Sequence, residues 1–424
     1  MSSALNNKAK AIVVCLVAEY SNVFTSSRRL ELLKEWINLL KGKAYILFKA
    51  RHVGLLCNGT TSTYVSKNEG PPYSDLRIFM RLHRPALIYI LMLGIYHAIA
   101  SLRSLMRIYK NIWKHIYIIL YGTEYIPWLY LVPLYITLKG LSSIAKIKTI
   151  LIHDYVDLYL MAYRYSKIER FLYNILESIS LKISSLFYSS SIITTGYLLS
   201  RGVERDKIIY FPPLASKEFE RERGPNVAND RIVLVYTGNI SKELSSFDLL
   251  LSALADLDED EKRSIRVNLI LLVGKGNLRD LEKLQKLLRD KELESVVNVK
   301  VNRPLHEVAE LASNSHIGLA LLDPKHPATK QMDFPLKVAE YLCSGTPVIY
   351  TNFGRVRFFL KHGFHGLMVE YKPESIKEVI RSILSNSSLL NELARNVNKV
   401  RKRFCLSTIA HELLVETLKR VLLI

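Results

Sequence analysis

One short stretch of the chain places a lysine and a glutamate at the start of a predicted helix. Pro335 suits the first helical turn, because its missing N–H would have no partner there. Lys337 and Glu340 lie three residues apart, so they share one face near the helix N-terminus. An ammonium, a carboxylate and a positive helix end can together hold a phosphorylated, hydroxyl-rich ligand. The simpler alternative is an exposed ion pair, which needs no function.

The residues around this pair predict the helix that carries it and the strand that follows. An apolar stripe at helical spacing is formed by Leu336, Ala339, Tyr341 and Leu342. Gly345 lies where a left-handed C-cap is favoured, and Pro347 prevents the helix from continuing. A buried strand is therefore expected from residue 348.

Two glycine-containing loops follow predicted strands in the same half of the chain. Their residues are Gly238 with Lys242, and Gly274, Lys275 and Gly276. Glycines at the carboxyl ends of strands let backbone N–H groups approach a phosphate. We expect both loops to converge with Lys337 on one ligand. The sequence contains no complete G-x-x-x-x-G-K-[ST] loop, which argues against an ordinary P-loop NTPase.

Strands and helices alternate along both halves of the chain, which predicts the α/β class with two doubly wound domains. In the first half, strands are expected at 11–17, 44–48, 116–121, 149–152 and 191–195. In the second half, they are expected at 232–236, 267–273, 297–299, 317–322 and 348–350.

A proline pair and a charged segment between 212 and 231 are typical of an interdomain linker. We expect an N-terminal domain over 1–215, a second domain over 216–400, and a C-terminal helix over 401–424 that packs back on the first domain. In such a pair of domains the ligand binds in the cleft that they face, beyond the carboxyl ends of the strands.

Positive charge is concentrated in the first half of the chain. The formal net charge is +20, and residues 1–220 contain 28 Lys and Arg against 14 Asp and Glu. Such a field attracts polyanions. Apolar, tyrosine-containing runs at 85–100 and 126–138 favour anionic lipid over nucleic acid. We therefore expect the first domain to contact an anionic membrane surface, with no nucleic-acid partner.

The two apolar runs also fit a membrane-spanning helix or a protein core. The first run has 16 residues, which is short of the ~20 that a membrane-spanning helix requires. Both runs could also be core helices of an α/β domain.

The cysteines are widely separated, at Cys15, Cys57, Cys343 and Cys405, with no C-x-x-C pair. This spacing predicts neither a zinc site nor a disulfide framework, and it favours a reducing compartment. We expect no metal and no cofactor.

The second domain resembles the nucleotide-sugar-binding domain of GT-B glycosyltransferases, most of all the β-1,4-mannosyltransferases that add the first mannose to dolichol-linked chitobiose. Residues 333–340 read D-F-P-L-K-V-A-E and are similar to D-L-P-M-K-V-V-D of that family. Residues 274–279, G-K-G-N-L-R, are similar to its G-K-G-P-L-K. In the first domain, I-H-D-Y at 152–155 resembles its W-H-N-Y.

This resemblance implies a GT-B fold of two Rossmann-like domains and an inverting mannosyltransferase. The donor would be GDP-mannose and the acceptor a lipid-diphosphate-linked oligosaccharide, at the cytoplasmic face of a membrane. Lysines and helix amides would stabilise the leaving diphosphate without a metal. The implied donor-site residues are Gly238, Lys242, Gly274, Lys275, Gly276, Asp333, Pro335, Lys337 and Glu340.

Two catalytic candidates lie at a strand end in the first domain. His153 or Asp154 could accept the proton of the acceptor hydroxyl, whereas Glu340 would bind the ribose hydroxyls of the nucleotide. The simpler alternative for His153 is a hydrogen-bonded core histidine. Two further functions stay open: a retaining GT-B enzyme that uses a UDP- or GDP-sugar, and a non-catalytic, membrane-bound partner of a glycosyltransferase.

Overall fold

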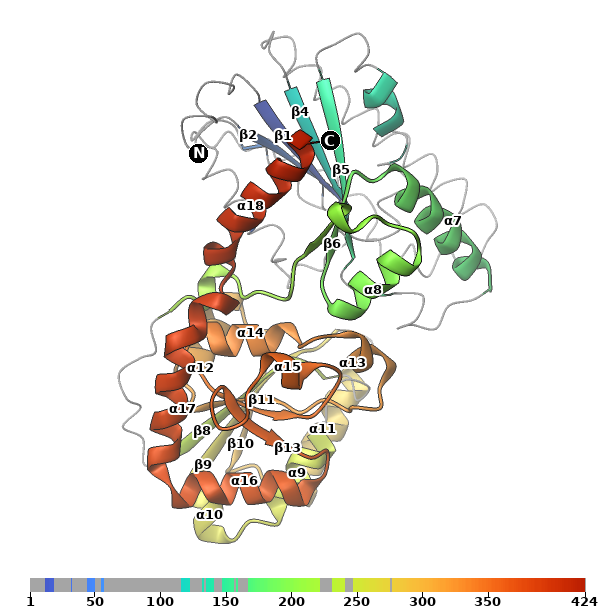
Figure 1. Cartoon of the computed structure of the whole chain (residues 1–424). Helices are drawn as coiled ribbons and strands as arrows, with labels where there is room; N and C mark the ends of the chain where they lie inside the picture. The colour runs from blue at the N-terminus through green and yellow to red at the C-terminus, as the bar shows by residue number, and fades with distance from the viewer. Residues whose placement is uncertain are drawn as a thin grey trace. The chain divides into compact units, whose positions relative to one another are not determined.

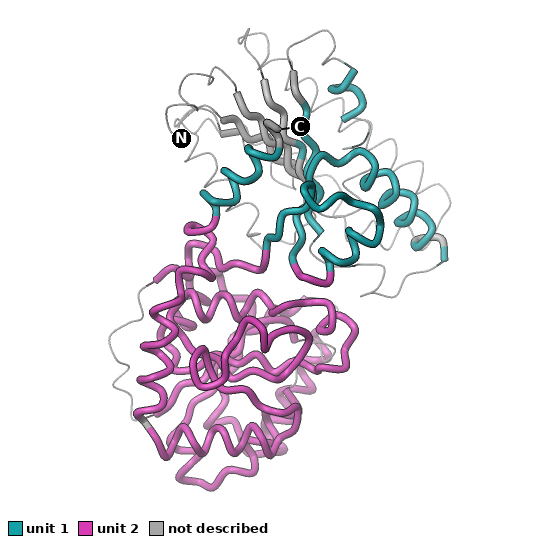
Figure 2. Tube along the Cα trace, viewed as in Figure 1, with its two compact units in different colours: residues 1–190, 194–211, 410–424 teal, residues 191–193, 212–409 magenta. Residues whose placement is uncertain are grey.

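The computed structural model describes residues 12–18, 32, 44–49, 55–56, 116–122, 132, 135–140, 147–155, 158, 167–221, 231–240, 247–274 and 277–423. These residues form two compact units (Figure 1, Figure 2). Unit 1 takes its described residues from 1–190, 194–211 and 410–424, and unit 2 from 191–193 and 212–409. The chain passes from unit 1 to unit 2 at 211–212, whereas the expected boundary is at 215. It returns to unit 1 at residue 410, inside the expected C-terminal segment.

Unit 1 is built on a seven-stranded sheet with the order β3-β2-β1-β4-β5-β6-β7. Its strands are β1 (Ile12–Ala18), β2 (Ala44–Lys49), β3 (Leu55–Leu56), β4 (Ile116–Gly122), β5 (Ile147–Tyr155), β6 (Leu186–Ser189) and β7 (Ile208–Tyr210). Neighbouring strands pair in parallel, except that β2 and β3 run antiparallel at the edge. This mostly parallel sheet confirms the α/β prediction.

The helices of unit 1 include α7 (Lys167–Ile183), most of α8 (Ile192–Ser200), the short η1 (Arg205–Lys207) and most of α18 (Leu406–Leu423). The strand expected at 191–195 is wrong. The strand lies earlier, at 186–189, where all four residues are buried and pair with β5. Ile192 begins a helix instead and is 42% exposed. The β-branched run there suggests a strand, but tertiary context overrides such propensities.

Unit 2 has a six-stranded, fully parallel sheet with the order β10-β9-β8-β11-β12-β13. Its strands are β8 (Ile232–Asn239), β9 (Ile265–Leu272), β10 (Val297–Val301), β11 (Ile317–Ala320), β12 (Val348–Thr351) and β13 (Gly366–Val369). The strand order reverses between β8 and β11. In doubly wound folds this reversal opens a crevice beyond the carboxyl ends of the strands, where ligands bind.

Helices cover both faces of this second sheet (Figure 1). They are η2 (Lys217–Phe219), α9 (Phe247–Ala255), α10 (Glu259–Arg263), α11 (Leu278–Asp290), α12 (Leu305–Ser313), α13 (Pro327–Gln331), α14 (Leu336–Cys343), α15 (Val356–Phe359), α16 (Pro373–Ser385), α17 (Ser387–Val400) and η4 (Arg401–Phe404). Alternate residues of β8 point to opposite faces, as the period of a strand requires. Leu234 and Tyr236 join the core with α9, while Val235 joins the core with α12 and α14.

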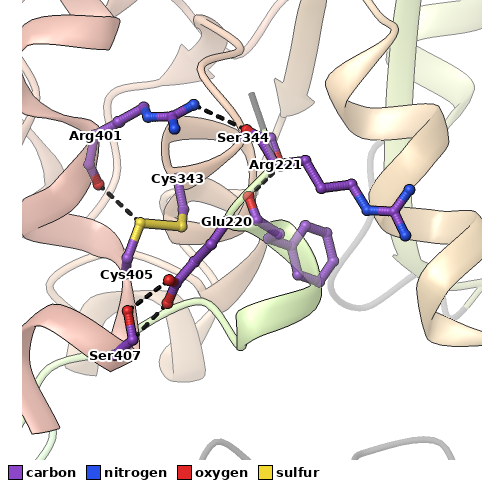
Figure 3. Close-up of a disulfide and its surroundings, with 8 residues drawn as sticks. Glu220, Arg221, Cys343, Ser344, Arg401, Cys405 and Ser407 are labelled. Carbon is purple, nitrogen blue, oxygen red and sulfur yellow. Dashed lines mark hydrogen bonds between the residues drawn. A yellow bond between two sulfur atoms is a disulfide. The ribbon is translucent and has the colours of Figure 1, made fainter. Parts of the chain in front are cut away.

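A disulfide links Cys343 to Cys405 within unit 2, across 62 residues of sequence (Figure 3). The expectation of no disulfide is therefore wrong. Cys343 ends α14, and Cys405 follows η4 and forms a β-bridge with Ala215. The fold brings the two Cα atoms to 5.4 Å, a proximity that linear spacing does not reveal.

Two further hydrogen bonds support the same corner of unit 2. Ser344 donates its hydroxyl to the carbonyl of Phe219, and Arg401 donates to the carbonyl of Arg221 at 2.8 Å (Figure 3). The end of α14 is thus joined to the first and last segments of the unit.

No helix among the described residues is long and apolar enough to cross a membrane. The apolar run at 85–100 lies outside the described residues, and of the run at 126–138 only 132 and 135–138 are described. Tyr135 and Leu138 are buried, whereas Ile136 is 61% exposed.

Candidate active site

The helix predicted around Lys337 is α14, and both of its ends follow from the sequence. Pro335 is the N-cap residue and supplies no side-chain hydrogen bond to the first turn. At the other end Gly345 has φ +78°, the left-handed conformation expected of it. The N–H of Thr346 donates to the carbonyl of Tyr341 at 2.8 Å, and that of Gly345 to Leu342 at 3.0 Å. These two bonds form a Schellman motif that ends the helix.

The buried face of α14 differs from the predicted stripe at one position. Leu336 is 40% exposed, although the stripe predicts its burial. Val338 is fully buried and takes its place. The first residue of α14 therefore lies at the edge of the fold.

Lys337 extends from α14 to the end of β8. Its Nζ lies 3.8 Å from the ring centroid of Tyr236. Gly238, the next-to-last residue of β8, has φ +147°, and a Cβ there would lie 2.9 Å from the same Nζ. Within the described part of the chain, no residue accepts a hydrogen bond from this ammonium or forms an ion pair with it. Its three N–H donors are available to an anion.

Glu340 lies one turn after Lys337 on the same helix and is half-buried. Burial raises the pKa of its carboxyl to about 7, against the opposing effect of the Lys337 charge. The carboxyl therefore titrates near neutral pH. Its ionised form is a strong acceptor for hydroxyl groups.

Asp333, the first residue of the predicted motif, is fully buried. Its Oδ2 accepts a hydrogen bond of 3.0 Å from the backbone N–H of Ile192. Both residues belong to unit 2. This hydrogen bond gives Asp333 a role in positioning the backbone before α14.

The two glycine loops follow neighbouring strands, because β8 pairs with β9. Gly238 pairs with Leu271 in this register, and Gly274 lies two residues beyond the end of β9. The structure therefore brings Gly238 and Lys337 together and places Gly274 at the same edge of the sheet. Lys242, Lys275 and Gly276 lie outside the described residues.

Tyr341 fixes α14 against the sheet, a role that the sequence did not reveal. Its hydroxyl accepts a 2.7 Å hydrogen bond from the N–H of Thr237 and lies 3.0 Å from the Thr237 hydroxyl. Its ring fills the space next to Gly318, where no side chain would fit. A tyrosine inside an apolar stripe is the available signal, since a buried hydroxyl requires a partner. Tyr236 carries no such signal, because its position is that of an ordinary strand residue.

In unit 1, His153 and Asp154 lie near the carboxyl end of β5, and both side chains are buried. Nδ1 of His153 is 3.0 Å from the hydroxyl of Ser180, which donates its own proton to the carbonyl of Glu177. The Ser180 oxygen must therefore accept from Nδ1–H, which assigns the tautomer. Burial holds the pKa of His153 well below its usual value, so the ring is neutral.

The arrangement around α14 has a clear chemical use. A cation with free donors, a helix N-terminus without a side-chain cap and a carboxylate one turn further suit an anionic group joined to a hydroxyl-bearing group. Among the residues that the structure describes, no cluster of His, Cys, Asp or Glu could hold a metal ion.

The model of the family "Glycosyl transferases group 1" matches residues 217–400, which cover β8 to β13 and α14. Unit 2 is similar to the group 1 glycosyl transferases over these residues. A chitobiosyldiphosphodolichol beta-mannosyltransferase from Debaryomyces hansenii is 24% identical over 204 residues, covering 43% of this chain. The match spans 42% of the length of that curated relative.

Solved structures resemble the chain over nearly its whole length. The Anabaena protein Alr3699/HepE, in complex with UDP and glucose, has a TM-score of 0.63 at 13% identity, over 96% of this chain and 99% of its own. Sucrose-phosphate synthase from Thermosynechococcus elongatus and a glycosyltransferase from Rickettsia africae both have a TM-score of 0.64, at 13% and 14% identity, over 97% of this chain and 99% of theirs. The expected GT-B fold is confirmed.

Proposed function

We propose that the chain is a glycosyltransferase that moves mannose from GDP-mannose to a lipid-diphosphate-linked oligosaccharide with inversion. The observation that carries this proposal is the Lys337 ammonium, which lies beside Gly238 at the end of β8 with no acceptor among the described residues. The family match of unit 2 supports glycosyl transfer. The mannosyl donor and the lipid acceptor are suggested by the Debaryomyces hansenii relative and by the motif at 333–340.

Lys337 would act on the leaving group. The acceptor oxygen forms a bond to C1 of the sugar while the bond from C1 to the diphosphate breaks, so the departing GDP takes the electron pair. A cation fixed in advance where this charge develops stabilises the transition state. The uncapped N-terminus of α14 adds a partial positive charge in the same place.

Glu340 would hold the nucleotide by accepting hydrogen bonds from two ribose hydroxyls. Its position one turn from Lys337 suits the separation of a ribose from its diphosphate. Pro335 and Asp333 would aim the helix. Gly238 and Gly274, with Lys242, Lys275 and Gly276 of the same loops, would line the phosphate path.

The acceptor hydroxyl must lose its proton, and we assign this step to the end of β5. His153 is neutral, which is the protonation state that a base needs, and Asp154 is the adjacent carboxylate. Both are buried in the described conformation, so the acceptor would reach them only after local rearrangement of unit 1.

We further propose that the enzyme works at the cytoplasmic face of a membrane, with unit 1 toward an anionic surface. The support is the charge of the chain, since residues 1–220 contain twice as many basic as acidic residues.

A donor screen tests the proposal. The full chain is incubated with a panel of nucleotide sugars and a short lipid-diphosphate acceptor, and the mass and linkage of the product are determined. A β-mannoside formed from GDP-mannose is expected, whereas an α-mannoside would overturn the inverting assignment. Lys337→Ala should lower kcat/KM for the donor by about 10- to 150-fold, because a hydrogen bond to a charged group contributes about 1.5–3 kcal/mol.

The matched control is Lys399→Ala on α17, which removes an exposed lysine from the same unit. Its kcat/KM for the donor should stay unchanged. Absence of any GDP-mannose binding by the wild-type chain would instead favour a non-catalytic partner.

A further inference from the structure

Helix α7 of unit 1 turns a basic and apolar side to solvent. The exposed residues among its described side chains are Lys167, Arg170, Phe171, Asn174, Ile175, Ser178 and Lys182. Phe171 is 64% exposed and Ile175 is 41% exposed. Successive residues of an α-helix are turned by about 100° around its axis. On that basis all of these residues except Arg170 lie within one arc about 100° wide around the helix.

The two fully buried residues of the same helix are polar, and the half-buried residues Leu172, Leu176, Ile179 and Ile183 form an apolar stripe opposite the exposed side. Glu177 is buried and accepts hydrogen bonds from Arg201 at 3.0 Å and Tyr197 at 2.8 Å. Ser180 is also buried and bonds to His153. This apolar stripe and the polar contacts together anchor α7 to its unit, and Phe171 with Ile175 are left outside the core.

Charge on the exposed side has one sign. Its three ionisable side chains among those described, Lys167, Arg170 and Lys182, are all cations. None of them forms an ion pair with another residue of the described part of the chain. The cations lie near both ends of a helix of 17 residues, or about 25 Å, with Phe171 and Ile175 between them.

We propose that the exposed side of α7 docks on the surface of an anionic lipid bilayer. Phe171 and Ile175 enter the headgroup region, and the three cations pair with lipid phosphates and carboxylates. A helix with apolar and basic residues on one side is suited to lying in the membrane interface. The long lysine and arginine side chains can reach the headgroups while their stems cover apolar surface.

A bilayer fits this surface better than a protein partner does. A stable protein interface needs about 800 Å² on each side, with a packed apolar centre. Two large apolar side chains on one helix fall short of that. On a membrane surface, each cation is attracted to lipid headgroups and each apolar side chain inserts between them. These separate contributions add up, so a small patch is enough for binding.

This inference deepens the membrane attachment proposed above by naming the surface that makes it. Donor binding by unit 2 is a separate property and serves as an independent readout.

Vesicle sedimentation with the full chain tests the inference. The wild-type chain should bind vesicles of phosphatidylcholine with phosphatidylserine, and binding should weaken as salt is raised. Phe171→Ser with Ile175→Ser should lower the partition coefficient about tenfold or more. Lys167→Gln with Arg170→Gln and Lys182→Gln should lower it on anionic vesicles and leave binding to pure phosphatidylcholine unchanged.

The matched control is Phe358→Ser in unit 2, because Phe358 is 67% exposed and also follows an arginine in sequence. It should partition like the wild type. All variants should bind GDP-mannose as the wild type does, since the substitutions are at exposed positions away from α14.

Each outcome bears on a different proposal. If the wild type binds vesicles and both α7 variants bind equally well, the role of α7 is overturned, while membrane attachment survives through other residues. If the wild type binds no vesicles, both are overturned. If the wild type does not bind GDP-mannose, only the donor assignment is contradicted.

Discussion

The ammonium of Lys337 lies 3.8 Å from the ring centroid of Tyr236, so a residue of β8 positions the cation of α14. A cation over an aromatic face is attracted by the negative charge of the π system. The ring of Tyr236 is itself fixed, because it is buried and packs edge-on against Phe247 at 4.9 Å. A flexible lysine is thereby held in one place before any ligand arrives, which is how a preorganised anion site works.

Replacing Tyr236 by Leu should weaken donor binding. A cation–π contact contributes about 0.5–2 kcal/mol, so the KM for GDP-mannose should rise about 2- to 30-fold. Tyr236→Phe keeps the ring and should restore most of the affinity. Steady-state kinetics of both variants provide the measurement. Equal KM values for the Leu and Phe variants would show that the ring does not position Lys337.

Replacing Gly238 by Ala should damage the same site by crowding it. The new Cβ would lie 2.9 Å from Nζ of Lys337 and 3.2 Å from the Tyr236 hydroxyl, at φ +147°. We expect both a loss of donor affinity and a loss of stability of about 1–3 kcal/mol from backbone strain. Calorimetric titration with GDP and urea unfolding measure the two effects.

Gly202→Ala separates strain from crowding. Gly202 has φ +82°, but an added Cβ would meet nothing within 4 Å, and the residue lies in unit 1. Its alanine variant should lose stability and keep its affinity for GDP. If Gly238→Ala also kept its affinity, the close approach of Lys337 to β8 would have no part in binding.

Donor affinity should depend on pH through Glu340. With a pKa of about 7, only about a tenth of the carboxyl is ionised at pH 6 and about nine tenths at pH 8. If the carboxylate holds the ribose, the KM for GDP-mannose should fall as pH rises from 6 to 8. Glu340→Gln should flatten this dependence, and Glu374→Gln on α16, an exposed position, should preserve it.

The titration of Glu340 also affects stability: donor affinity should rise with pH, whereas the stability of the fold should fall. The folded pKa of Glu340 lies above its unfolded value near 4.5, so the native state binds more protons between those values. The contribution of the protonated Glu340 carboxyl to the free energy of unfolding is complete below pH 4.5 and is lost as pH rises through 7. Glu340→Gln should remove this decline in urea unfolding experiments. An unchanged decline would contradict the raised pKa.

Reduction of the Cys343–Cys405 disulfide should destabilise unit 2. The bond closes a loop of 62 residues, for which the chain-entropy model gives about 4 kcal/mol. The urea midpoint of the wild type should therefore fall when reductant is added. The double variant Cys343→Ala with Cys405→Ala should unfold at the same midpoint with and without reductant. A wild-type midpoint that ignores reductant would mean that the bond does not support the unit.

Local signals predicted α14 well. Pro335 and Gly345 mark its ends in the sequence; in the structure Pro335 is the N-cap and Gly345 is the left-handed residue that follows the C-cap Ser344. The alternation of apolar runs with helical segments likewise predicted the parallel sheets, because buried parallel strands read as continuous apolar stretches. These features are governed by neighbours in sequence, which a single chain reveals.

Features that depend on distant residues escaped prediction. The proximity of Cys343 to Cys405 depends on how the last helices return to α14. The pairing of Lys337 with Tyr236 depends on how α14 packs beside β8, from which β9, β10 and β11 separate it in the chain. At 191–195, β-branched residues suggested a strand, although the neighbouring 186–189 run fills that place in the sheet. Each outcome is decided by tertiary packing, which local propensity does not encode.

The division of unit 1 has a consequence for how the protein is made. Its last contributors are residues 410–424, where Thr417 bonds to the buried Tyr188 of β6 at 2.6 Å and Arg420 donates to the carbonyl of Ile208 at 2.8 Å. Unit 2 is synthesised before that segment. On the ribosome, unit 1 therefore lacks its last segment until all of unit 2 has been synthesised, and the nascent chain must keep β6 and β7 competent for α18 until then.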